Sequence, residues 1–115
     1  VRDSRKMPWL VREGDVLAAA EVAESRRARR QGLRRRDRLE GALVLRPCRN
    51  VHSVGMRFAI DVAFCDGDGI VLKTCCLRPW RLSPFVPRAA FAIEAPSGAF
   101  ERWSLRVGDK VEVKA

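Results

Sequence analysis

Hydrophobic and polar positions alternate with a period of two from residue 56 to residue 65. The apolar positions are Met56, Phe58, Ile60, Val62 and Phe64. This period is typical of a β-strand with one buried and one exposed face. The next four residues, 66–69, alternate Asp and Gly, and 70–77 is again largely apolar. The pattern predicts a central β-hairpin whose first strand is half-buried.

The register of this hairpin depends on its loop. A simple two-residue loop at residues 67–68 would place Lys73 beside Val62 on the apolar face. A bulge or an odd-numbered loop would bring a different set to that face, and we favour this second arrangement. That set is Ile70, Leu72 and Cys76.

Shorter segments continue the β-rich pattern. Apolar runs at 8–11 and 16–22 flank a turn at Glu13-Gly14-Asp15 and predict an N-terminal hairpin. Further strands are expected at 39–45, 89–95 and 110–114. They would enclose a core together with the central hairpin.

Two other segments are not strands in this pattern. Ser97 is the expected N-cap of a short helix, whose inner side would carry Phe100, Trp103 and Val107. The proline-rich segment 79–87 predicts a semi-rigid loop anchored by the aromatic side chains of Trp80 and Phe85.

A chain of 115 residues and 13.0 kDa has the size of one domain, here residues 1–115, and 47% hydrophobic residues suffice for a core. The short strands and glycine turns predict a mainly β (α+β) fold. We expect a compact β-barrel or sandwich of short antiparallel strands with one or two short helices. No run resembles a membrane span or a signal peptide, so we expect a soluble protein.

The formal net charge is +9, and most of it lies in one segment. Residues 26–38 hold eight arginines and one acid, Asp37. The arginines are Arg26, Arg27, Arg29, Arg30, Arg34, Arg35, Arg36 and Arg38. Such an excess favours contact with phosphate chains or another polyanion. Arginine-rich composition without a binding role would give the same run, so both interpretations stay open.

Four cysteines occur without any C-x-x-C pair, which argues against zinc ribbons and disulfide scaffolds. We therefore expect free thiols, no cofactor and a reducing, cytoplasmic compartment. The soft ligands Cys48, His52 and Met56 follow one another at a spacing of four and could begin a metal site. Cys48 and His52 could also act as nucleophile and base. A structural loop with Met56 in the core is the third interpretation.

Acidic side chains offer little chemistry. Asp61 and Glu94 lie on the expected non-core sides of two strands and could line a cleft near Trp80 as a carboxylate pair. Pairing with nearby arginines, such as Arg57, would explain Asp61 equally well. Because no known catalytic arrangement stands out, we favour a protein that is not an enzyme.

Motifs spread along the chain resemble the family called domain of unknown function 192. They are 32–37, 39–45, His52 with 56–64, 66–71, 92–95, 98–100 and 107–111. The resemblance implies a small β-rich prokaryotic protein, in a family with no established activity and some exported members. Residues 56–59 read Met-Arg-Phe-Ala, where many members read Met-Lys-Asn-Thr. This chain thus lacks two neutral polar side chains at that point.

These observations favour a binding or accessory module with a docking surface for a partner, such as another protein, near Trp80 and Phe85. Nucleic-acid or other polyanion binding through residues 26–38 is the first alternative. That segment lacks aromatic side chains among its arginines, as single-strand binders usually have. A metal or thiol site at Cys48 and His52 is the second alternative.

Overall fold

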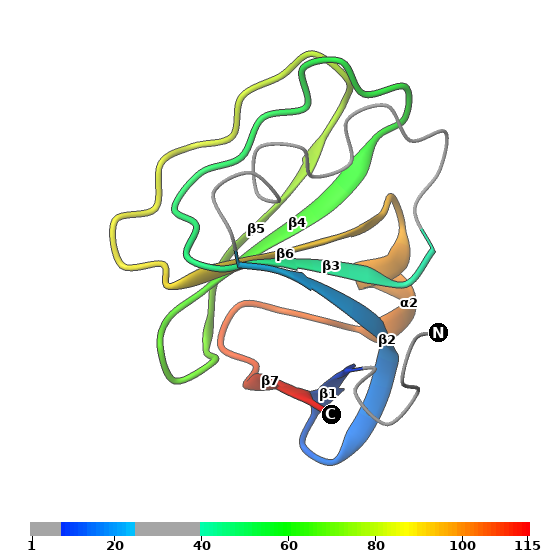
Figure 1. Ribbon diagram of the computed structural model, residues 1–115, viewed down its shortest axis with the longest axis vertical. Helices are drawn as coiled ribbons and strands as arrows, with labels where there is room; N and C mark the ends of the chain where they lie inside the picture. Colours follow the sequence, from blue (N-terminus) through cyan, green and yellow to red (C-terminus); the bar gives the residue numbers. More distant parts are fainter. Residues whose placement is uncertain (1–7, 25–39) are drawn as a thin grey trace.

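The computed structural model describes residues 8–24 and 40–115. Within these ranges seven strands form one sheet in the order β5-β4-β6-β3-β2-β1-β7 (Figure 1). The strands are β1 (Trp9–Arg12), β2 (Asp15–Ala23), β3 (Ala42–Leu45), β4 (Ile60–Cys65), β5 (Val71–Leu77), β6 (Phe91–Pro96) and β7 (Val111–Lys114). One helix, α2 (Ala99–Trp103), is present in the described part. The prediction of a mainly β fold is confirmed.

The sheet is mixed rather than purely antiparallel. Strand β2 runs parallel to β3, whereas every other neighbouring pair is antiparallel. A parallel pair needs a long crossover, and the connection from Ala23 to Ala42 has the length for one. The N-terminal hairpin is as predicted, with Arg12 opposite Asp15 across the turn.

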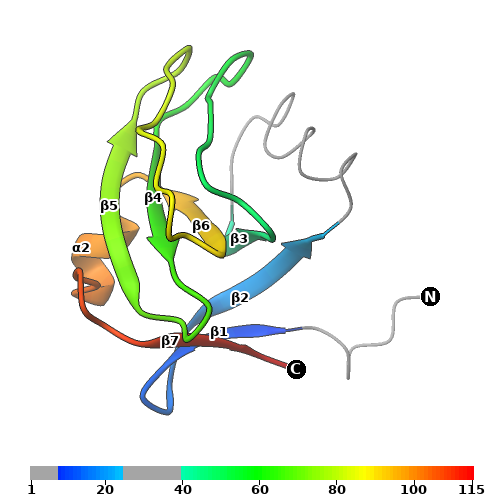
Figure 2. The ribbon, with the colours of Figure 1, turned by 90° about the vertical axis from the view of Figure 1, so that its left-hand side faces the viewer.

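The sheet curls strongly, so its two edge strands approach each other (Figure 2). Ile70 and Lys110 form an isolated bridge, and the Val71 N–H donates to the Asp109 carbonyl at 2.8 Å. Gly69 permits this approach, because its φ is +86° and a Cβ there would overlap the Val111 carbonyl oxygen. The result is an open barrel rather than a fully closed one.

Hydrophobic side chains form two clusters, which lie on opposite faces of β4 and β6. The helix-side core contains Leu10, Ala20, Ala42, Val44, Ala63, Cys65, Val71, Phe91, Ile93, Ala95, Ala99, Phe100, Leu105 and Val111. The loop-side core contains Ala23, Leu43, Leu45, Val51, Met56, Ile60, Val62, Phe64, Leu77, Ala89 and Ala92. Met56, Ile60, Val62 and Phe64 are therefore in a core, as predicted.

The expectation of a half-buried strand at 56–65 is wrong in two respects. The strand begins at Ile60, and all six of its residues are buried. Its alternate positions fill different cores, because α2 covers one face and the long loops before β4 and after β5 cover the other. Small side chains, such as Ala63 and Cys65, fit the helix side.

The favoured hairpin register is also wrong. Lys73 lies opposite Phe64, and Leu77 lies opposite Ile60, so Leu72 and Cys76 face the other side. A bulge does occur, but it lies between Phe64 and Cys65, next to the turn. Lys73 is exposed, so its charge is not buried by this register.

Helix α2 differs from its prediction at both ends. Gly98 is the N-cap and makes no side-chain capping bond. The Asp61 carboxylate replaces the expected Ser97 hydroxyl and accepts from the Gly98 and Phe100 N–H groups at 3.0 and 3.1 Å. Phe100 is buried and Trp103 packs beside it, but Val107 is 60% exposed because the helix ends before it.

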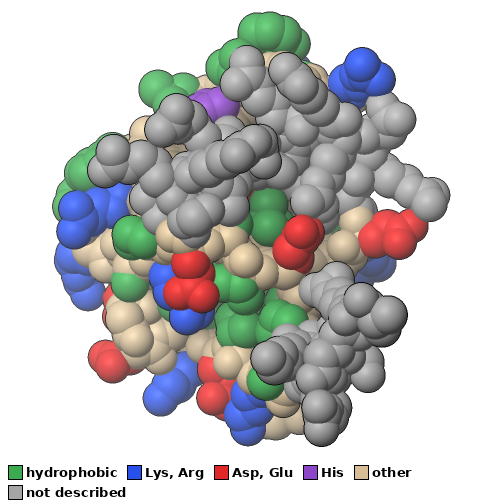
Figure 3. Space-filling model, in the orientation of Figure 1, with side chains coloured by type: hydrophobic (Ala, Val, Ile, Leu, Met, Phe, Trp, Pro, Cys, Tyr) green, Lys and Arg blue, Asp and Glu red, His purple; other side chains and the backbone are tan. Residues whose placement is uncertain are grey.

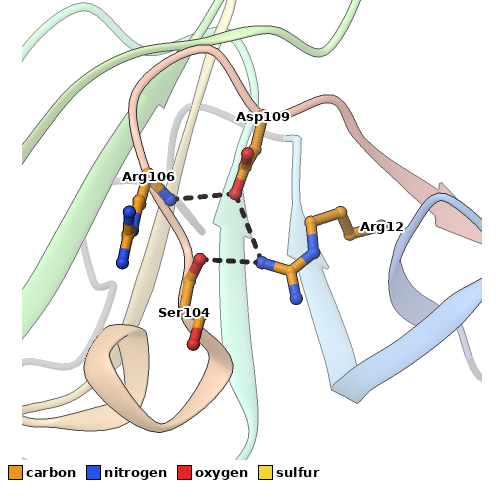
Figure 4. A network of polar contacts seen from close by, with 4 residues as sticks. All are labelled: Arg12, Ser104, Arg106 and Asp109. Carbon is orange, nitrogen blue, oxygen red and sulfur yellow. Dashed lines mark hydrogen bonds and ion pairs between the residues drawn. The ribbon is translucent and has the colours of Figure 1, made fainter.

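A polar network fixes the end of α2 to β1 and β7 (Figure 4). The Arg12 guanidinium donates to the Ser104 carbonyl at 3.0 Å and pairs with Asp109 at 3.2 Å. Asp109 also accepts from the Arg106 N–H at 2.9 Å, which closes the turn predicted at 106–109.

In the described residues, no helix is long and apolar enough to cross a membrane.

Candidate functional site

Two loops lie side by side over the loop-side core and form what we call the loop platform, residues 48–59 and 78–88 (Figures 1 and 2). The first precedes β4 and the second follows β5. Irregularly spaced backbone hydrogen bonds join the two loops. The N–H groups of Ser53, Trp80, Ser83 and Val86 donate at 2.8 to 2.9 Å to carbonyls of the opposite loop. His52 and Leu82 form an isolated bridge at its centre.

Two buried serines, one on each loop, form hydrogen bonds to the backbone of the opposite loop. The Ser53 hydroxyl accepts from the Arg81 N–H at 2.8 Å and contacts the Arg78 carbonyl as donor. The Ser83 hydroxyl accepts from the Val51 N–H at 2.8 Å and donates to the Pro84 carbonyl at 3.0 Å. Each serine thus satisfies backbone groups that burial would otherwise leave unpaired.

The predicted aromatic pair does not anchor the loop platform. Val51 and Met56 are buried in the loop-side core, and Ala89 joins them just after the second loop. Trp80 and Phe85 are 64% and 62% exposed, so their expected role as anchors is wrong. The buried serines and Val51 take that role.

Exposed apolar side chains gather on the outside of the loop platform. Leu82 is 70% exposed beside Trp80 and Phe85, and Val54 is 38% exposed on the other loop. Figure 3 shows hydrophobic side chains along the upper and upper left margin, where Figure 1 places these loops. Exposed clusters of this kind mark interaction surfaces more often than isolated apolar residues do.

Trp80 is held in an unusual backbone conformation. Its φ is +62°, in the left-handed region that bulky residues avoid at a cost on the order of 1 to 3 kcal/mol. Ser53 binds the N–H groups of both Trp80 and Arg81, at 2.9 and 2.8 Å. These bonds fix the backbone around a tryptophan whose ring is largely in solvent.

The loop platform is purely basic. It contains five arginines and the one histidine, and neither loop contains Asp or Glu. The arginines are Arg49, Arg57, Arg78, Arg81 and Arg88, all exposed. An anionic partner would meet no carboxylate on these loops.

The proposed ligands Cys48, His52 and Met56 each have surroundings of their own. The Cys48 thiol contacts the Asn50 carbonyl at 3.1 Å, and His52 Nδ1 accepts from the Val54 N–H at 3.2 Å. Met56 is buried in the loop-side core. Among the residues described, no group of three or more His, Cys, Asp and Glu side chains could hold a metal ion.

The structure does not bring Asp61 and Glu94 together. In the register of β4 and β6, Asp61 lies opposite Ala95 and Glu94 lies opposite Val62, so the two carboxylates face opposite sides of the sheet. Asp61 caps α2, while Glu94 is 3% exposed on the side of the loop-side core. Trp80 belongs to the loop platform, whereas Asp61 contacts the first turn of α2.

The arginine segment 26–38 lies outside the described residues. The polyanion prediction for Arg26, Arg27, Arg29, Arg30, Arg34, Arg35, Arg36 and Arg38 therefore stays a prediction.

All four cysteines are free. Burial, with a smaller effect from Asp66, raises the pKa of Cys65 from 9.0 to about 12. Burial also raises the pKa of Cys75, against the charge of Lys73. Cys65 is therefore protonated and packed like a small apolar residue at neutral pH.

Sequence reasoning found Trp80 and Phe85 but missed Ser53, Ser83 and Leu82. A serine in a loop carries no sign of its own that it will be buried. The prolines at 79, 84 and 87 indicated a semi-rigid segment, but they did not indicate that it pairs with the first loop, residues 48–59.

Two solved structures share this fold. A protein of unknown function from Novosphingobium aromaticivorans has a TM-score of 0.75 at 18% identity, covering 92% of this chain and 83% of that chain. A "putative transcription regulator" from Sinorhizobium meliloti also has a TM-score of 0.75, at 20% identity, covering 92% and 91%. At these identities the similarity concerns the fold.

Sequence relatives occur in three Pyrococcus species. A UPF0127 protein of Pyrococcus furiosus is 40% identical over 65 residues, which cover 55% of this chain and 54% of the relative. One of Pyrococcus abyssi is 41% identical, covering 54% and 53%. The chain thus matches about half the length of these two. A third, of Pyrococcus horikoshii, is 29% identical and covers 97% of this chain and 96% of the relative.

The family comparison agrees with these relatives and with the motifs quoted above. Residues 10–113 match the model of domain of unknown function 192, described as an uncharacterized ACR. The match takes in every strand from β2 to β6 and both loops of the platform. This chain belongs to the domain of unknown function 192 family.

Proposed function

We propose that this protein is a non-enzymatic binding module whose docking surface is the loop platform. The observation that carries the proposal is the presentation of Trp80, which is 64% exposed at a φ of +62°. A strained backbone at an exposed aromatic residue has no benefit for packing, and such strain clusters at binding sites.

The rigidity of the loop platform supports this role. A surface that is already ordered loses little conformational entropy when a partner binds. The hydrogen bonds of Ser53 and Ser83 order both loops in the free protein. Tryptophan and arginine, which the platform combines, are also the side chains that most often dominate binding energy.

Site-specific photo-cross-linking in cells tests the proposal. A photoreactive amino acid at Leu82 should give discrete cross-linked species. The same group at Val107 is the matched control, because Val107 is 60% exposed and Leu82 is 70% exposed. Trp80→Ala in the Leu82 probe should weaken the cross-links. Equal yields from both probe positions would contradict the proposal.

Polyanion binding by residues 26–38 is the second candidate, favoured by eight arginines against one acid. The Sinorhizobium meliloti neighbour, which shares this fold, is named a "putative transcription regulator", and polyanion binding would be compatible with such a role. Charge reversal at Arg26, Arg29 and Arg30 should then abolish weak, salt-sensitive binding to duplex DNA.

We also propose a cytoplasmic location, since four free thiols suit a reducing compartment.

A further inference from the structure

We propose that the partner of the loop platform is a single-stranded nucleic acid, an inference that rests on the proposed docking function. Bases would stack on Trp80 and Phe85, and phosphates would contact the arginines between and beside them. Proteins that bind single strands combine aromatic side chains with a positively charged path for the backbone. The platform has both, whereas residues 26–38 have only the charge.

The aromatic rings are available for stacking. Trp80 and Phe85 are 64% and 62% exposed, on a backbone that hydrogen bonds hold in place. The Val86 N–H, next to Phe85, donates to the Arg49 carbonyl at 2.8 Å. Both rings are thus displayed from fixed points, and neither is needed to fill the core.

The charges are available as well. In the part of the chain that the structure describes, no carboxylate pairs with Arg49, Arg78, Arg81 or Arg88. Arg81 donates to the Trp80 carbonyl at 3.3 Å, which keeps a guanidinium beside the tryptophan. Cations and rings therefore alternate along the second loop, as a chain of alternating phosphates and bases requires.

Unpaired strands fit this surface better than a duplex. Reading a duplex groove takes a helix or a two-stranded ribbon, and the platform consists of irregular loops. The bases of a duplex are stacked on one another and leave no face for Trp80 or Phe85. In a single strand each base offers a free face to an aromatic side chain.

An anionic lipid surface or an acidic polypeptide would match only some of the exposed rings and arginines of the loop platform. The helices that bind membrane surfaces place apolar residues on one face and cations on the other. The loop platform contains no helix. An acidic polypeptide would pair with the arginines, but it has no repeating planar groups for the two rings.

Fluorescence anisotropy with labelled 15-nucleotide oligo-dT and oligo-U tests the inference. Trp80→Ala and Phe85→Ala should each weaken binding on the order of 10-fold, and Trp80→Phe should restore most of the loss because a ring returns. Arg81→Ala should lower the slope of log affinity against log salt by about 0.7. Arg102→Ala, an exposed arginine on α2, should leave binding unchanged.

The same titrations in an Arg26→Glu, Arg29→Glu, Arg30→Glu background separate the two basic regions. The Trp80→Ala effect should persist there. The inference would be overturned if Trp80→Ala and Phe85→Ala bound the oligonucleotides as tightly as wild type. It would also be overturned if wild type bound polyglutamate or vesicles of anionic phospholipid as tightly as it binds the oligonucleotides. If oligonucleotides fail while the Leu82 probe still cross-links a protein, the docking function stands and this inference falls.

Discussion

Asp61 caps a helix that begins 38 residues later in the chain, and its Oδ2 accepts from the Phe100 N–H at 3.1 Å. The same oxygen accepts from the Gly98 N–H at 3.0 Å. Asp61 is on β4 and Phe100 is on α2, so this carboxylate attaches the helix to the strand next to the edge strand β5. The residue therefore has a structural role that accounts for its burial.

Removing this cap should destabilise the protein. Asp61→Ala should lower the free energy of unfolding by about 1–2 kcal/mol, because two helix N–H groups lose their acceptor. Asp61→Asn should cost less, since an amide oxygen can still accept. Urea denaturation would measure both changes. Glu101→Ala on the exposed side of α2 is the control, and an equal loss there would refute the capping role.

Burial should decide the cost of losing aliphatic carbons. Ile60 is fully buried and Leu82 is 70% exposed. Ile60→Ala should lower the free energy of unfolding by about 2–5 kcal/mol, whereas Leu82→Ala should change it by about 0.5 kcal/mol or less. Chemical denaturation of both variants checks this, and similar losses would show that the loop-side core is misplaced.

Ser53 should control the order of the loop platform. Ser53→Ala leaves the Arg81 N–H without its hydroxyl acceptor, at a cost of about 1–3 kcal/mol. Hydrogen exchange should become faster at Trp80 and Arg81, while exchange in β4 changes little. Ser97→Ala, at an exposed serine, serves as the control. Unchanged exchange at Arg81 would contradict the proposed locking of the two loops.

Cys65 should make stability fall at alkaline pH. Its pKa is about 12 in the folded protein and 9.0 without burial, so above pH 9 the unfolded chain releases a proton that the folded chain keeps. The thiol's contribution is full below pH 9 and is lost as pH rises toward 12. Because other groups also titrate there, wild type should be compared with Cys65→Ala.

The comparison uses urea denaturation at pH 7 and pH 10.5. The loss of stability between these two pH values should be smaller in Cys65→Ala than in wild type. Cys76→Ala, at an exposed cysteine, should behave like wild type. Identical pH dependence in Cys65→Ala and wild type would show that the thiol is not shielded.

Sequence patterns were enough to predict the mainly β fold, the N-terminal hairpin and the core positions Met56, Ile60, Val62 and Phe64. These features follow from local chemistry: alternation of apolar side chains, glycines in turns and the size of the chain. Trp80 and Phe85 were also singled out from sequence, both as anchors of their loop and as the place where a partner would dock; their exposure argues against the first role.

The face that each strand position occupies, and what covers that face, depend on contacts between distant segments. The alternation in β4 could not show that both faces are buried, because α2 and the loop platform come from distant segments. The parallel pairing of β2 with β3, the cap from Asp61 and the bonds of Ser53 also join residues far apart in the chain. Local patterns reflect the period of an element, whereas long-range contacts depend on how all elements pack together.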